Sequence, residues 1–84
     1  MKTIEEKSIV FKTDFGRIQV AINYSEHKKN WYVQGSLYGK LETGGSSNAS
    51  AIKSCIKKFI VDNKLKMIDK VTHYNYGIYA VYIS

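Results

Sequence analysis

Side chains that could carry out covalent or metal chemistry are scarce in this sequence. The 84-residue chain has a single cysteine, Cys55, and two histidines, His27 and His73. A nucleophile with its base and orienting group, or a set of three metal ligands, needs more such side chains than these. Glu5 and Glu6 are adjacent carboxylates in a segment that we expect to fray, so they form a poor acid–base pair. We therefore predict no catalytic activity, no metal site and no cofactor.

Cations and aromatic rings are the side chains that the sequence supplies in quantity. Thirteen Lys and Arg against seven Asp and Glu give a formal net charge of +6, and seven residues are tyrosines. Such a charge attracts nucleic acid or an acidic protein surface. Arg17 is the one arginine in the sequence, and reading of bases in a groove favours the planar fork of arginine over lysine. The composition therefore favours contact with phosphates over sequence-specific reading.

The first candidate binding surface is the polar face of the predicted strands. It combines cations, amides and rings, and bases stack on such rings with about 1–3 kcal/mol each. Its structural alternative is a solvated sheet face with ordinary cross-strand tyrosine pairs. The residues of this surface are Arg17, Gln19, Asn23, Tyr32, Gln34, Tyr38 and Lys40.

Two further candidates involve the predicted helix and a polar corner. Residues 43–48 precede the helix, where Gly45, Ser46 and Ser47 could receive an anion on free backbone amides, although any strand-to-helix turn needs such residues. The solvent-facing side of the helix and the corner at residues 25–30 carry lysines that could follow a phosphate backbone or simply be solvated. These lysines are Lys28, Lys29, Lys53, Lys57 and Lys58, with Lys64 and Lys66 beyond the helix.

Hydrophobic periodicity predicts the elements that position these residues. Residues 8–13 and 17–24 form a β-hairpin around a turn at residues 14–16, because apolar and polar side chains alternate strictly in the second segment. Residues 31–42 form a third strand. A helix follows from about Asn48 to residues 63–66, with one apolar stripe. The members of that stripe are Ala49, Ile52, Cys55, Ile56, Phe59 and Ile60.

Residues 67–74 and 77–84 are both rich in strand-forming side chains. We predict a second hairpin, with one long strand bulged at Gly77 as the alternative. The last segment is apolar on both faces, which suits a central strand or one covered by a second subunit. The expected fold is one α+β domain over residues 1–84, with a single antiparallel sheet in β-β-β-α-β-β order and the amphipathic helix packed on one face.

In layout alone, residues 8–64 resemble the three strands followed by a helix of integrase N-terminal and plant AP2-type DNA-binding domains. Those families use several arginines along the sheet, whereas this chain has Arg17 alone, and we assign no family.

The single cysteine and the start of the sequence indicate a compartment. One cysteine cannot form an intramolecular disulfide, and the first residues contain no apolar signal segment. We predict a cytoplasmic protein without a membrane segment. The bias toward Lys, Ile, Asn and Tyr is typical of an AT-rich genome, such as that of a phage or mobile element.

These observations predict a small non-catalytic module that docks on nucleic acid or on a nucleic-acid-handling complex. The alternative is an inhibitor of the anti-defence type, which blocks a protein surface through an edge strand or an exposed patch around Tyr74, Tyr76, Tyr79 and Tyr82. Either function is compatible with a homo-oligomer. A third class of function is the binding of a small ligand between subunits.

Overall fold

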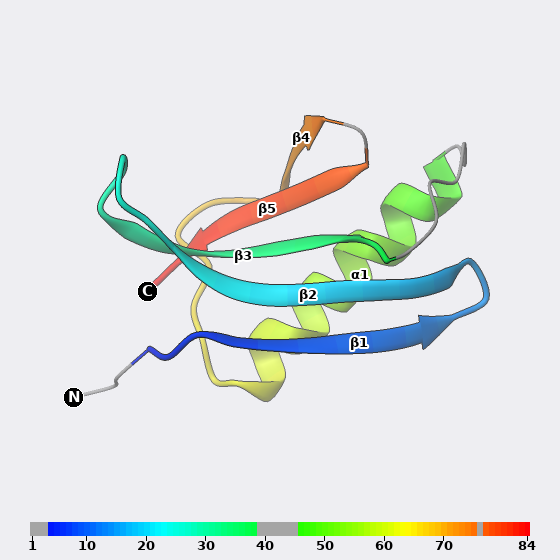
Figure 1. Cartoon of the computed structure of the whole chain (residues 1–84), viewed down its shortest axis with the longest axis horizontal. Helices are drawn as coiled ribbons and strands as arrows, with labels where there is room; N and C mark the ends of the chain where they lie inside the picture. Colours follow the sequence, from blue (N-terminus) through cyan, green and yellow to red (C-terminus); the bar gives the residue numbers. More distant parts are fainter. Residues whose placement is uncertain (1–3, 39–45, 76) are drawn as a thin grey trace.

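The computed structural model describes residues 4–38, 46–75 and 77–84, and only the backbone at residues 46–48 and 75. The strands form one antiparallel sheet in the order β1-β2-β3-β5-β4, and α1 lies on one of its faces (Figure 1). The predicted α+β class and element order are thus confirmed. The elements are β1 (Lys7–Thr13), β2 (Gly16–Ser25), β3 (Asn30–Leu37), α1 (Ser46–Asp62), β4 (Thr72–Asn75) and β5 (Ile78–Ile83). Among the described residues, no helix has the length and apolar character needed to cross a membrane.

The boundaries of the middle elements differ from the prediction. The helix begins at Ser46, two residues before Asn48, and ends at Asp62, before the predicted residues 63–66. Strand β3 ends at Leu37, and residues 39–42 of its predicted span lie outside the described residues.

The C-terminal segments form the predicted hairpin and not one long strand. Thr72 pairs with Ala80, and the β4–β5 register shifts after His73 in a bulge. The predicted strand at residues 67–74 is divided, because Met67 forms only an isolated bridge with Ile83 and β4 starts later. Strand β5 lies between β3 and β4, the central position that was one of the two predicted for this segment.

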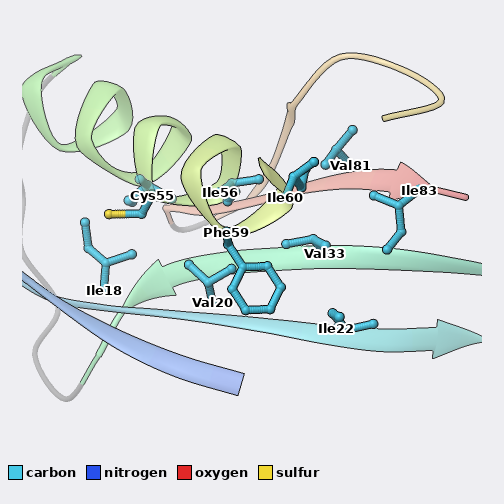
Figure 2. Packing of buried hydrophobic residues seen from close by; sticks show 11 residues of the cluster. Ile18, Val20, Ile22, Val33, Cys55, Ile56, Phe59, Ile60, Val81 and Ile83 are labelled. Atoms are coloured by element: carbon cyan, nitrogen blue, oxygen red, sulfur yellow. The ribbon is translucent and has the colours of Figure 1, made fainter. Parts of the chain in front are cut away.

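The core lies between α1 and the central strands. Ile18, Val20 and Ile22 alternate along β2 toward the helix and are at most 4% exposed. The predicted stripe of α1 packs onto them from Ile52 to Ile60, whereas Ala49 is partly exposed and Ala51 packs against the core instead. Figure 2 shows the Cys55 sulfur beside Ile18. The other buried members are Val33, Ile52, Ile56, Phe59, Ile60, Val81 and Ile83.

The helix passes close over Gly35 of β3. A Cβ atom built at this position would lie 2.8 Å from Cγ1 of Ile56 and 3.2 Å from Cγ2 of Ile52. Glycine is therefore the residue that allows this helix–sheet approach without displacing neighbours.

A left-handed residue closes α1. Lys64 has a φ of 56°, the Leu65 N–H donates to the Ile60 carbonyl at 2.9 Å, and the Lys64 N–H donates to the Val61 carbonyl at 3.1 Å. This is the Schellman arrangement, in which the left-handed position is usually glycine.

We expect Lys64→Gly to raise the free energy of unfolding by about 1 kcal/mol, because glycine adopts this conformation without the Cβ penalty. Urea unfolding followed by circular dichroism measures the change. An unchanged or lower midpoint would contradict the strain at this cap.

Candidate nucleic-acid interface

The face of the sheet opposite α1 is polar and aromatic, and we call it the open face. In Figure 1 the helix lies behind the strands, and the open face is turned toward the reader. Its side chains alternate with the buried ones along β2 and β3, whereas on β5 the small Ala80 of this face is buried as well. Its residues include Ser8, Val10 and Lys12 of β1, Arg17, Gln19, Ala21 and Asn23 of β2, Tyr32, Gln34 and Ser36 of β3, and Ala80 and Tyr82 of β5.

The structure brings the strand residues of the first predicted surface together on this face. Gln34 pairs with Ala21, and Tyr32 pairs with Asn23. Tyr38 follows β3, is 49% exposed, and its N–H donates to the Arg17 carbonyl at 2.7 Å. Gln19 lies on β2 between Arg17 and Ala21 and pairs with Ser36. The open face is thus a continuous set of amides and rings with Arg17 at one end.

Three tyrosines form a cluster at the other end of the open face. The rings of Tyr32 and Tyr82 lie on adjacent strands with centroids 6.0 Å apart and planes at 61°. Tyr74, which is 55% exposed, shares a side-chain hydrogen bond with Tyr82. That bond raises the pKa of Tyr74, and partial burial and the neighbouring phenols add to the effect. We call Tyr32, Tyr74 and Tyr82 the tyrosine cluster.

Cations lie at both ends of the open face. Lys12 of β1 pairs directly with Arg17, so the two side chains share a face. At the opposite end, Lys28 and Lys29 occupy the exposed turn between β2 and β3. The Lys28 N–H donates to Ser25 Oγ at 3.1 Å, which fixes the start of this turn.

The helix lysines do not join this surface. Lys53, Lys57 and Lys58 are exposed on α1, on the other side of the sheet. The Lys53 ammonium lies 5.5 Å from the ring centroid of Tyr79, which in turn contacts His73 with centroids 4.9 Å apart. The predicted binding residues therefore divide between two faces.

Some predicted positions lie outside what the structure describes. Lys40 and Gly45 belong to the undescribed residues 39–45. Ser46 and Ser47 form the start of α1, as a helix N-terminal anion site requires, but only their backbone is described.

The described side chains with catalytic potential are dispersed. Cys55 is 8% exposed, and burial raises the pKa of its thiol, with nearby Lys58 opposing the shift. The thiol is therefore neutral at neutral pH and packs as a core residue, as predicted. His27 lies exposed in a turn, and His73 lies against a ring. In the described part of the chain, no three His, Cys, Asp or Glu residues group as metal ligands would.

The tyrosine patch expected for a protein inhibitor is divided as well. Tyr79 lies on the helix side of β5, paired across from Gly35, whereas Tyr82 lies on the open face. Tyr76 is outside the described residues. Tyr74 and Tyr82 contribute to the tyrosine cluster instead.

Sequence reasoning did not assign Tyr74, Tyr82 or Lys12 to the first surface. The alternation along β5 does place Tyr82 on the face of the sheet opposite to that of the buried Val81 and Ile83. The missing information was the pairing of β5 with β3, which puts Tyr82 beside Tyr32. Lys12 could have been found from the hairpin register, since it faces Arg17 across the turn.

Comparisons with known proteins identify no relative. No family model matches the chain, and neither the curated proteins nor the solved structures include a match.

Proposed function

We propose that the open face binds single-stranded nucleic acid and that the protein acts as a non-catalytic binding module. The observation that carries this proposal is the placement of Tyr32 and Tyr82 side by side on two central strands, on a sheet face that no described element covers. Unpaired bases stack on such rings, whereas bases inside a duplex are not accessible to them.

The cations of the open face support the proposal. Lys12 and Arg17 lie at one end and Lys28 and Lys29 at the other. From Arg17 to Ser25, β2 rises by eight residues, which corresponds to about 26 Å at the usual rise of a strand. A strand of nucleic acid that crosses the face would have its phosphates near both pairs and its bases over the tyrosine cluster. The net charge of +6 adds long-range attraction.

The amides between the two ends support base contacts without a fixed sequence code. Gln19, Asn23 and Gln34 each offer a donor and an acceptor on the open face. Their flexible side chains suit several base edges, so we propose a modest sequence preference, as is usual when stacking and charge dominate.

A salt-titrated binding assay tests the location of the phosphate contacts. For labelled single-stranded RNA and DNA, log K should fall linearly with log salt, by about 0.7 for each phosphate contact. Lys12→Ala/Arg17→Ala should reduce that slope by about 1.4, because two contacts are removed. The matched control is Lys57→Ala/Lys58→Ala, which removes the same charge from α1 and should leave the local contacts unchanged.

Three results would contradict the proposal. They are a flat salt response of the wild type, equal slopes for the two double variants, and tighter binding of a matched duplex than of the single strand.

A further inference from the structure

Within the described residues, the outer edge of β1 pairs with no other strand. Of the strands that the structure describes, β1 pairs with β2 alone and forms one end of the sheet (Figure 1). The Arg17 carbonyl accepts a bond from the Tyr38 N–H, so the Arg17 peptide groups are directed toward β3. Those of its partner Lys12 must then be directed away from β2. By alternation, Ser8, Val10 and Lys12 present their N–H and C=O groups to the free edge.

The two edges of the sheet differ in how well they are protected. Strand β4 has four residues and a bulge, which are features that discourage further pairing. Strand β1 has seven residues in regular register. It also exposes apolar side chains, since Ile9 is 47% and Val10 is 41% exposed. A long, regular and apolar edge is a template for another strand.

We propose that a second copy of this chain pairs with β1, so that two β1 strands run antiparallel around a two-fold axis at Ile9. In this register Ile9 lies opposite Ile9 on the helix side. Val10 lies opposite Ser8 of the second copy, and Glu6 lies opposite Lys12 of the second copy. The outward backbone groups of Ser8 and Val10 then bond to each other. By symmetry, the dimer has two Glu6–Lys12 pairs.

The charged side chains favour the register with the axis at Ile9 over the register with the axis at Val10. An axis at Val10 would pair the same outward backbone groups, but it would place Glu6 opposite Asp14 of the second copy. Like charges directly opposite each other on adjacent strands are destabilising, whereas opposite charges stabilise the pair. The axis at Ile9 is therefore favoured.

A hollow on the open face has the right position for the incoming lysine. Its volume is about 430 Å³. Glu6 and Ser8 line it from the β1 segment, and Gln19 and Asn23 line it from β2. In the proposed register, Lys12 of the second copy lies beside Glu6, so its ammonium group reaches this hollow. The completing residues of the lining are Lys7, Ala21 and Ile22.

The dimer would join two open faces into one continuous sheet of ten strands, with both helices on the same side. The inference is argued from the free edge, its exposed apolar residues and its charges. It shares Lys12 with the proposed nucleic-acid interface, so the dimer is tested on protein freed of nucleic acid.

Val10→Pro tests the pairing directly. Proline removes the N–H that faces the second copy, and it leaves the β1–β2 ladder intact because that N–H is not part of it. Sedimentation of nuclease-treated protein at physiological ionic strength measures the dimer. We expect a concentration-dependent dimer for the wild type and a dissociation constant roughly ten- to a hundredfold higher for Val10→Pro, which loses one bond in each copy. The matched control Val10→Thr keeps the N–H and should retain the dimer.

A charge exchange tests the register. Glu6→Lys and Lys12→Glu should each weaken the dimer, and the double exchange Glu6→Lys/Lys12→Glu should restore it. A wild type that stays monomeric at all concentrations would overturn the proposal. So would a dimer that survives Val10→Pro with an unchanged circular dichroism spectrum, or single exchanges that the double exchange does not rescue.

Discussion

Replacement of Gly35 by valine is expected to lower the free energy of unfolding by about 3 kcal/mol. The new side chain would enter the space occupied by Ile52 and Ile56, which are 1% and 0% exposed. Both are β-branched and have one strongly preferred rotamer in a helix, so they cannot turn away without opening the core. A domain of this length has roughly 4–13 kcal/mol of stability in total. The loss is therefore a large part of what holds the fold together.

Urea unfolding followed by Trp31 fluorescence measures this effect, with two companion variants. Gly35→Ala should cost about 1 kcal/mol, because its single carbon meets the same atoms but reduces the freedom of the unfolded chain. Ser36→Val places valine at the next position, on the open face, and should change stability by no more than about 0.5 kcal/mol. Equal midpoints for Gly35→Val and Ser36→Val would show that α1 does not pack against β3 at this point.

The double substitution Tyr32→Leu/Tyr82→Leu is expected to weaken the binding of single-stranded nucleic acid about a hundredfold. Each stacked base contributes about 1–3 kcal/mol, and leucine removes both aromatic faces while it keeps apolar volume on the sheet. The lysines and Arg17 are unchanged, so the salt dependence of the remaining affinity should persist. Fluorescence anisotropy with a labelled oligonucleotide measures the loss, and circular dichroism verifies the fold.

The control for this pair is Tyr24→Leu. Tyr24 lies on the helix side of β2, where its ring meets Trp31 edge-on with centroids 5.2 Å apart, and it is 40% exposed. The chemical change is the same, but the side chain is on the wrong face to contact the proposed ligand. A similar loss of affinity in Tyr24→Leu, or none in the double variant, would refute stacking on the open face.

The sequence was sufficient to predict local structure where periodicity is strong. The alternation of Ile18, Val20 and Ile22 predicted a strand with one buried face, and the stripe around Ile56 predicted the helix that covers it. Cys55 was recognised as a core residue because it falls on that stripe. These patterns depend only on neighbours along the chain. The same alternation predicted which polar residues of β2 and β3 lie on the face opposite the core.

Pairing between distant segments was beyond the reach of periodicity. No local pattern specifies that β5 enters the sheet beside β3, and this pairing is what joins Tyr82 to Tyr32. The role of Gly35 was equally hidden, since a glycine in a strand does not reveal which helix crosses it. The separation of Lys53 and Lys57 from Arg17 follows from the helix lying on one face only.

The insertion of β5 between β3 and β4 also constrains the order of assembly. Strands β1 to β3 are joined by short turns and can pair early, whereas among the described strands the other edge of β3 gains its neighbour only when β5 is added. Until β5 is added, the edge of β3 that will lie inside the finished sheet is therefore exposed. Chaperone capture or misassociation of incompletely folded chains would act at that edge, and β5 closes it.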